Sequence, residues 1–349
     1  MVDKVMESLS ERKKKILCAV VDGYIDSATP VSSKEIQENY LPDCSSATIR
    51  NELSTLESMG YLTQPHVSAG RIPSEKAFRF YVNKLMYESD LSADDVDVID
   101  KVFERRNASI EEVIKAVTKV IADVTNYTSV VVKEDMSDTI TAIRLLDLTN
   151  GKLLVVIVTD SRVLKDGMVD LPDDFTDAML LQAERWLNKI FVGKHVSEFI
   201  NFDYPFALVN GEFSQFNALF KKIIDVLKKV SLENGMDVTM YGESNILRHS
   251  EYSDSVSAQK FMSEMEQKDK IAKLFTNDGG ENGSVTVKIG SDDNAIEGCS
   301  VVTARVSLGD NVSGSIGVIG PVRMDYKKVL GVLERISVAI IDLIGDNKK

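Results

Sequence analysis

The sequence predicts an α+β protein of several domains, and three observations lead to this prediction. The first ninety residues read as helix, short helix, turn, helix and ribbon, in that order. Short strands rich in Val and Ile occur in two separate blocks, at 128–168 and 284–319. A mainly helical stretch separates the blocks, and a long helix follows the second. This order predicts an N-terminal winged helix-turn-helix and an α+β domain whose sheet is interrupted by an insertion.

The chain of 349 residues is long enough for two or three domains, each with its own core. We expect the winged helix-turn-helix at 1–88, the first part of the α+β domain at 89–171, the insertion at 172–280 and the second part at 281–349. Six acidic residues lie between Tyr87 and Asp100, which is typical of a hinge between domains.

The three N-terminal helices have clear start signals. Ser10–Asp26 carries an apolar stripe, and Ser32-Ser33-Lys34-Glu35 is a capping-box pattern for a second helix at Ser33–Tyr40. The third helix, Ser45–Met59, has an apolar stripe on one face and polar residues on the other. In this module the third helix enters the major groove of DNA. Its candidate DNA-contacting residues are Ser46, Thr48, Arg50, Asn51 and Ser54, although the same side chains on an isolated helix would only face solvent.

The stretch 62–84 is predicted to form the wing and the start of the next helix. Pro65 and Gly70 favour loop geometry between short extended pieces, and Ser74 is an N-cap candidate. Arg71 lies on the returning strand, where a flexible cation would reach a phosphate, and His66 is a second candidate for phosphate contact. For Pro65 and Gly70 we expect a structural role.

Charge restricts where DNA is able to bind. The chain has a net charge of −13, but residues 61–84 contain four Lys and Arg against one acid, Glu75. Residues 1–90 carry 11 basic and 13 acidic residues, so most of the negative charge lies in the remaining chain. DNA contact is therefore expected on one confined basic face.

The rest of the chain alternates between helix and strand patterns. A helix is predicted at Val102–Thr125 and a long final helix at Tyr326–Ile344. In the insertion we expect a strand at Asp237–Tyr241 and helices at Phe175–Phe191, Phe213–Val230 and Ser257–Phe275. The Asn150-Gly151 pair is a hairpin-turn signal. The strands predicted for the α+β domain are Thr128–Lys133, Thr139–Asp147, Lys152–Val158, Arg162–Met168, Ser284–Ile289, Val301–Leu308 and Gly314–Ile319.

The sequence gives no reason to expect an enzyme, a cofactor or a metal site. Its three histidines are isolated, and its three cysteines form neither a disulfide framework nor a metal-binding pair. Glycines at 309, 314, 317 and 320 match no nucleotide-binding loop, so we expect them to shape a hairpin and a closely packed strand. No apolar run is long enough for a membrane span, and the N-terminus lacks a signal peptide. These features favour a cytoplasmic protein.

Three stretches of the chain resemble the heat-inducible transcription repressor HrcA family of bacteria. The most specific is Gln64-Pro65-His66-Val67-Ser68-Ala69-Gly70-Arg71-Ile72-Pro73, in which Val67 replaces the usual Thr. Ser45–Leu53 is similar to the recognition helix of the family. Gly314–Tyr326 is similar to its C-terminal signature, with Val322 where Thr is usual. The likeness extends over essentially the whole chain and is weakest in the insertion.

The resemblance implies a winged-helix domain, a GAF-like domain and a dimerisation domain inserted into the latter. It implies a homodimeric repressor of chaperone operons that binds double-stranded DNA at an inverted-repeat operator, CIRCE, and depends on the GroEL chaperonin. It implies no catalytic role. A metabolite-responsive repressor with an effector in the GAF-like domain remains the alternative, and an enzyme on the same scaffold is a third, less favoured reading.

A dimer surface needs exposed apolar side chains, and the helices of the insertion are candidates to supply them. The same side chains would serve equally well as an internal core, and both roles remain open at this point. The residues concerned are Met179, Leu180, Trp186, Leu187, Ile190 and Phe191.

Overall fold

The computed structural model describes residues 9–85, 91–103, 109–135, 138–148, 151–161, 163–170, 176–196, 217–234, 236–276, 282–290, 296–309 and 312–346. It divides into two compact units. The first contains residues up to Val131, Thr239–Val306 and Ser315–Lys349, and the second contains Val132–Val238 and Ser307–Gly314. The second unit therefore interrupts the first along the sequence.

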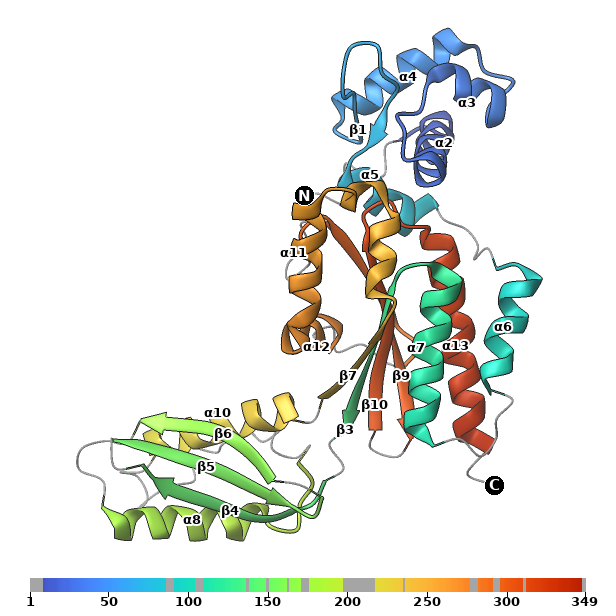
Figure 1. Cartoon of the computed structure of the whole chain (residues 1–349). Coiled ribbons are helices and arrows are strands. Elements are labelled where there is room, and N and C mark those ends of the chain that lie inside the picture. The colour runs from blue at the N-terminus through green and yellow to red at the C-terminus, as the bar shows by residue number, and fades with distance from the viewer. Residues whose placement is uncertain are drawn as a thin grey trace. The chain divides into compact units, whose positions relative to one another are not determined.

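The N-terminal part of the first unit is a winged helix-turn-helix, as predicted (Figure 1). Its helices are α2 (Glu11–Ser27), α3 (Ser33–Asn39) and α4 (Ser46–Ser58), and its ribbon pairs β1 (Leu62–Thr63) with β2 (Ile72–Pro73). Each helix begins where the sequence places a serine cap, because the serine hydroxyl accepts a backbone N–H of the first turn. Glu35 completes the expected capping box of α3.

Apolar side chains from all three helices meet in one core beneath the ribbon. Ile16, Val20, Ile36, Ile49 and Leu53 are almost completely buried there. After the ribbon, Ser74 caps α5 (Glu75–Phe80), which continues as a π-helical turn, η1 (Tyr81–Leu85). Phe78 and Phe80 point inward from α5, and the Phe80 ring meets Tyr61 edge-on.

The acidic segment predicted as a hinge is in part a helix. Ala93–Phe103 forms α6, and a separate helix, α7, runs over Ile110–Thr125, so the single helix expected at Val102–Thr125 is wrong at its start. The acids of α6 serve as ion-pair partners for the final helix, α13 (Tyr326–Asp346), where Asp95 meets Lys328 and Asp100 meets Arg335. Ile99 of α6 is completely buried, so α6 packs as part of the fold, and the ion pairs with α13 neutralise part of its negative charge.

A five-stranded sheet forms the centre of the α+β domain, with strand order β7-β3-β10-β9-β8. In Figure 1, α7 and α13 lie along one side of it, and α11 (Ser255–Glu266) and α12 (Lys268–Thr276) lie along the other. Two short 3-10 helices, η4 (Glu243–Arg248) and η5 (Ser250–Tyr252), precede α11. The strands are β3 (Thr128–Asp135), β7 (Met236–Tyr241), β8 (Val285–Ile289), β9 (Cys299–Gly309) and β10 (Val312–Pro321).

The glycines of β10 allow close packing, as the sequence suggested. A Cβ atom on Gly317 would lie 2.1 Å from the carbonyl oxygen of Val302 and 2.9 Å from the Phe275 ring. Since both faces of β10 are buried, a side chain at this position has no space. The glycine pattern therefore belongs to a packed strand and not to a nucleotide-binding loop.

The strands assigned to the first part of the α+β sheet after Lys133 belong elsewhere. β4 (Ile140–Asp147), β5 (Lys152–Thr159) and β6 (Val163–Asp170) form their own antiparallel sheet in the second unit. The second unit thus begins near Val132 and returns near Val238, whereas we expected an insertion at 172–280. The predicted turn joins β4 and β5 with Gly151 at φ +72°, while Asn150 lies outside the described residues.

The described part of the second unit also holds two helices, α8 (Asp177–Phe191) and α10 (Asn217–Asn234). One face of the sheet, with Leu153, Val155 and Ile157 at its centre, packs against them. Leu187 and Phe191 are fully buried in this core, and the other proposed dimer-surface side chains of α8 pack against it: Met179, Leu180, Trp186 and Ile190. For these residues the internal-core reading is confirmed.

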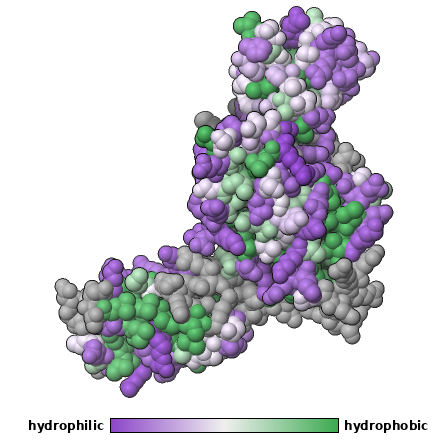
Figure 2. Space-filling view, viewed as in Figure 1, coloured by the Kyte–Doolittle hydropathy of each residue, from purple (hydrophilic) through white to green (hydrophobic). Residues whose placement is uncertain are grey.

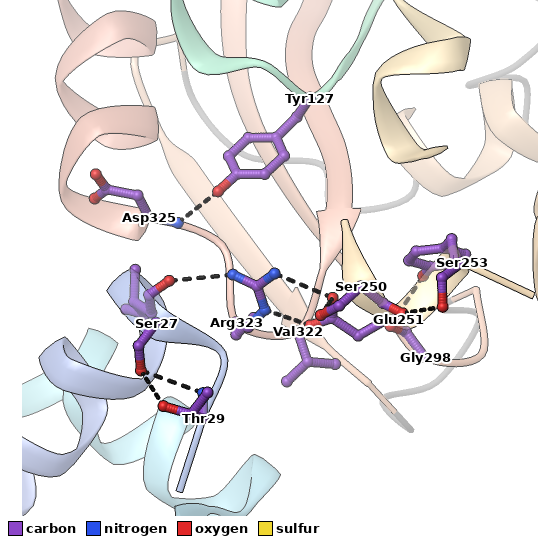
Figure 3. A network of polar contacts seen from close by, with 12 residues as sticks. Ser27, Thr29, Tyr127, Ser250, Glu251, Ser253, Gly298, Val322, Arg323 and Asp325 are labelled. Atoms are coloured by element: carbon purple, nitrogen blue, oxygen red, sulfur yellow. Dashed lines mark hydrogen bonds and ion pairs between the residues drawn. The ribbon is translucent and has the colours of Figure 1, made fainter. Parts of the chain in front are cut away.

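A polar cluster joins the winged helix-turn-helix to the α+β domain within the first unit (Figure 3). Arg323 donates to the carboxylate of Glu251 through Nε and Nη2, the latter at 3.2 Å, and donates from Nη1 to the carbonyl oxygen of Ile25 at 3.1 Å. Next to it, the backbone N–H of Asp325 donates to the Tyr127 hydroxyl at 2.9 Å. Burial would raise the pKa of Glu251, but hydrogen bonds and the charge of Arg323 hold it below its ordinary value.

Replacing Glu251 with Gln is expected to change how stability depends on pH. Because the pKa of Glu251 is lowered in the fold, its stabilising effect is complete above about 4.5 and is lost as the pH falls through the lower, folded value. Urea unfolding of Glu251→Gln at pH 7 should show a loss on the order of 1 kcal/mol, and the loss should shrink as the pH is lowered below about 4.5. A loss that does not change with pH would contradict the ion pair. Glu297→Gln, which removes a fully exposed ion pair with Lys260, is the control and should change stability less.

Candidate DNA-binding surface

The exposed face of α4 contains three of the predicted DNA-contacting residues. Arg50, Asn51 and Ser54 are exposed, and the neighbouring Thr55 is exposed as well. The hydroxyls of Ser54 and Thr55 donate to the backbone carbonyls of Arg50 and Asn51 one turn earlier, which fixes their rotamers. Within the described residues the Arg50 and Asn51 side chains have no partner, so they are available for bidentate contacts with base edges.

Ser46 and Thr48 occupy a different position from that of the exposed residues. Both are half-buried at the start of α4. The Ser46 hydroxyl lies 3.1 Å from that of Ser33 on α3, and the Thr48 hydroxyl lies 2.9 Å from the Ser45 cap. These contacts join α3 to α4 and close the first turn of α4. The structure therefore gives both hydroxyls an internal partner, and DNA contact by either one stays a prediction.

The wing, residues 62–73, presents its tip to solvent. Pro65, His66, Val67 and Ser68 are exposed, and Val67 is 97% exposed. The side-chain amide of Gln64 holds the tip in shape by donating to the carbonyls of Val67, at 3.0 Å, and Ala69, at 2.9 Å. Sequence reasoning missed this role, because no spacing rule marks a Gln whose amide bridges two carbonyls of a loop. His66 is on the tip, as predicted, with Nδ1 3.3 Å from the Ser68 hydroxyl.

Arg71 is not the freely reaching cation that the sequence suggested. Its side chain is only 13% exposed, and Nη2 lies 2.8 Å from a carboxylate oxygen of Glu57 on α4. Its backbone pairs with Val31 through two hydrogen bonds, of 2.8 and 2.9 Å. The ion pair draws the side chain back onto α4, so Arg71 ties the wing to the recognition helix. A contact with phosphate would require this pair to open.

Two further cations of residues 61–84 also serve internal contacts. Lys76 donates to the carbonyl of Met59 at the end of α4 and lies 4.3 Å from the centre of the Tyr61 ring. Arg79 pairs with Glu75 and donates to the carbonyl of Ile289. Three of the four cations therefore make contacts within the fold, and Lys84 is the one that is exposed.

A cavity of about 320 Å³ in the α+β domain is one candidate place for an effector. Tyr252 and Phe261 contribute aromatic walls, and the buried Cys299 also lines the cavity. Its three lining glutamates already have cationic partners, namely Glu251 with Arg323, Glu264 with Lys270 and Glu297 with Lys260. A polar ligand would have to displace one of these partners. This arrangement does not favour the metabolite-responsive alternative.

The part of the chain that the structure describes contains no group of three or more His, Cys, Asp or Glu side chains placed to hold a metal ion. None of its helices combines the length and the apolar character that crossing a membrane requires.

The protein is a DNA-binding transcription regulator of the winged-helix class. Its defining features are a recognition helix with an exposed polar face, a wing held beside this helix and a further α+β domain. Two family models match the chain. "Winged helix-turn-helix transcription repressor, HrcA DNA-binding" covers residues 8–85, and "HrcA protein C terminal domain" covers residues 111–330. The chain belongs to the HrcA family.

Full-length relatives agree with this assignment. A heat-inducible transcription repressor HrcA from Clostridium tetani is 36% identical, with 98% of each chain covered. One from Ruminiclostridium cellulolyticum is 35% identical, with 94% of this chain and 95% of the relative covered. Transcriptional repression, the role these names give, is not enzymatic.

One solved structure supports the fold. It is described as a hypothetical protein, shares 23% sequence identity and covers 97% of this chain and 99% of its own, with a TM-score of 0.58. At this identity the likeness concerns the fold alone.

Replacing Gly70 with Ala is expected to displace the wing. The added Cβ would lie 2.4 Å from the carbonyl oxygen of Val31 and 2.6 Å from that of Pro30, and backbone atoms have little freedom to move away. We expect a loss of about 1–3 kcal/mol in the free energy of unfolding, measured by urea titration. Gly60→Ala is the matched control. Gly60 has φ +78° and nothing within 4 Å of the added Cβ, so it reports backbone strain alone. A Gly70→Ala protein as stable as the wild type would contradict the contact, while the loss in Gly60→Ala shows what backbone strain alone costs.

Proposed function

We propose that the protein is a homodimeric repressor of chaperone operons that binds an inverted-repeat operator of the CIRCE type. The observation that carries the proposal is the exposed face of α4 beside a rigid wing, in a chain of the HrcA family. Arg50, Asn51 and Ser54 read bases in the major groove, and the wing tip around His66 contacts the backbone. DNA of this kind is found in the bacterial cytoplasm, where the protein acts.

Symmetry supports the dimer. An inverted repeat presents two identical half-sites related by a two-fold axis, so two copies of the chain are needed to place one recognition helix on each. The chain as a whole is strongly acidic and repels phosphates. A second recognition helix raises affinity without adding basic surface, because the second half-site is bound from a high effective concentration.

The sheet of the second unit offers the surface for this pairing. One of its faces is covered by α8 and α10, and the opposite face carries apolar rows across three strands. Leu146, Leu154 and Met168 are aligned in one row, and Ala142, Val158 and Val163 in another. Leu146, Val163 and Met168 are exposed, and Figure 2 shows hydrophobic residues gathered over these strands. We assign this face to a second copy of the chain, because an exposed apolar sheet face gains free energy when it is covered.

Dependence on the GroEL chaperonin completes the proposal, and the family resemblance supports it. A repressor that needs the chaperonin to stay in its active fold would lose activity when misfolded proteins occupy the chaperonin. Operator binding by the purified protein after mild heating, with and without GroEL and ATP, tests this dependence. Binding that recovers equally well without the chaperonin would remove this part of the proposal.

Replacing Arg50 with Ala is expected to weaken specific binding. Loss of a bidentate base contact should cost about 1–3 kcal/mol on the operator and little on random DNA, measured by fluorescence anisotropy at fixed salt. Arg335→Ala, which removes an exposed arginine of α13 outside the winged helix-turn-helix and outside the proposed dimer face, should leave both affinities unchanged. An equal loss on operator and random DNA would show that Arg50 contacts phosphate and does not read a base.

Replacing Met168 with Lys is expected to shift the protein from dimer to monomer. The side chain is 59% exposed at the β6 end of an apolar row, so its lysine replacement is tolerated in the monomer but is buried in the proposed dimer. Sedimentation velocity measures the change. Leu181→Lys, on α8 and 57% exposed, is the matched control and should remain dimeric. A Met168→Lys protein that stays dimeric would exclude this face.

A further inference from the structure

The segment Gly314–Tyr326 has no part in the DNA-binding surface, although its sequence is one of the three stretches that carry the family likeness. In the structure it consists of the buried strand β10, a turn and the first residue of α13. The turn places Arg323 against the end of α2, the first helix of the winged helix-turn-helix (Figure 3).

Arg323 acts as a cap for α2 that is supplied from another domain. The last carbonyl groups of a helix lack partners inside the helix. In α2, the carbonyl of Tyr24 accepts from the backbone of Ala28, and that of Ile25 accepts from Arg323. A cation at this end also interacts favourably with the helix dipole. Glu251 holds the other edge of the same guanidinium, and the Arg323 side chain is only 14% exposed.

Three further contacts hold the winged helix-turn-helix, one at α2 and two at α5. Asp22, one turn before Ile25, accepts from the Tyr81 hydroxyl at 2.6 Å and pairs with Lys327 at 3.2 Å. At α5, Arg79 donates to the carbonyl of Ile289 at 2.8 Å. The Phe78 ring meets Tyr326 at a centroid distance of 6.1 Å. Contacts at α2 and α5 together fix the direction of the domain, since one contact alone would leave it free to rotate.

We propose that Arg323 is a positioning residue for operator binding, which sets the orientation of the winged helix-turn-helix and thereby the spacing of the two recognition helices. The inference rests on the proposed function, because spacing has meaning only for a dimer on an inverted repeat. The position requires an arginine, because only a planar guanidinium group binds two partners at once. One edge of the group binds the Glu251 carboxylate, and the remaining nitrogen binds the Ile25 carbonyl. A lysine reaches one of these partners at a time.

The experiment compares a duplex carrying both half-sites with a duplex carrying one. Arg323→Ala should weaken binding to the full operator about tenfold, because the second recognition helix is no longer delivered at the correct spacing. Its affinity for the single half-site should stay within about twofold of the wild type, since one module binds there alone. Arg323→Lys should behave like Arg323→Ala. Arg335→Ala is the matched control, because Arg335 pairs with Asp100 entirely inside the α+β domain.

The outcomes separate positioning from a merely structural role. Equal losses on both duplexes would mean that Arg323 supports the fold of the winged helix-turn-helix and would overturn the inference. Unchanged affinity for both, or a loss matched by Arg335→Ala, would also overturn it. As a further readout, an operator with one base pair added between the half-sites should be rejected less strongly by Arg323→Ala than by the wild type.

A measurement without DNA distinguishes failure of this inference from failure of the proposed function. Nitroxide labels at Ser54→Cys on α4 and Val338→Cys on α13, in a Cys44→Ser background, report the distance between the two domains of one chain when diluted with unlabelled protein. Burial raises the pKa of Cys18 and of Cys299 to about 11, so these thiols react slowly. Arg323→Ala should broaden the distance distribution, and an unchanged distribution would overturn the inference. If the wild type fails to prefer the operator over random DNA, the proposed function is wrong whatever the labels show.

Discussion

The backbone contact between the wing and the start of the helix-turn-helix is the constraint on which the DNA-binding surface depends. Arg71 and Val31 exchange two hydrogen bonds, and Gly70 lies so close to the carbonyls of Pro30 and Val31 that a side chain has no space there. The Arg71–Glu57 ion pair then joins the same strand to α4. These contacts hold the wing against the recognition helix, which reduces the conformational freedom that DNA binding would otherwise have to remove.

Several cations of the winged helix-turn-helix make contacts within the protein, and this limits the positive charge that is available for contact with DNA phosphates. Arg71, Lys76 and Arg79 all hold helix ends or carboxylates inside the fold, in a chain of net charge −13. Affinity from phosphate neutralisation is correspondingly limited. Under the proposed function, specific base contacts from Arg50 and Asn51 and the pairing of two chains would supply a larger share. Such a protein depends strongly on correct geometry, which agrees with a winged helix-turn-helix held at both α2 and α5.

Local signals in the sequence predicted the elements well, and contacts between distant residues account for the errors. Serine caps and the Glu35 capping box placed α2, α3 and α4 to within a residue or two. The sequence did not show that β4, β5 and β6 form a separate sheet. The pattern of apolar and polar residues identifies a strand but does not show which other strand it pairs with. We predicted a hinge for the acidic segment around Asp95, because the basic residues that pair with it, Lys328 and Arg335, lie far along the chain. We predicted a solvent-exposed side chain for Arg71 for the same reason, since a single sequence does not show that Glu57 lies beside it. The exposed polar face of α4 was predictable, because helical periodicity alone separates it from the apolar stripe.

The most direct test of the central claim, that α4 and the wing form one DNA-binding surface duplicated by symmetry, is a hydroxyl-radical footprint of the purified protein on the chaperone promoters of its own genome. The account predicts two protected stretches related by a two-fold axis, on one face of the duplex, with centres separated by about one helical turn or a multiple of it. Protection of a single stretch, of two stretches on opposite faces, or of no stretch above the background on random DNA would contradict it.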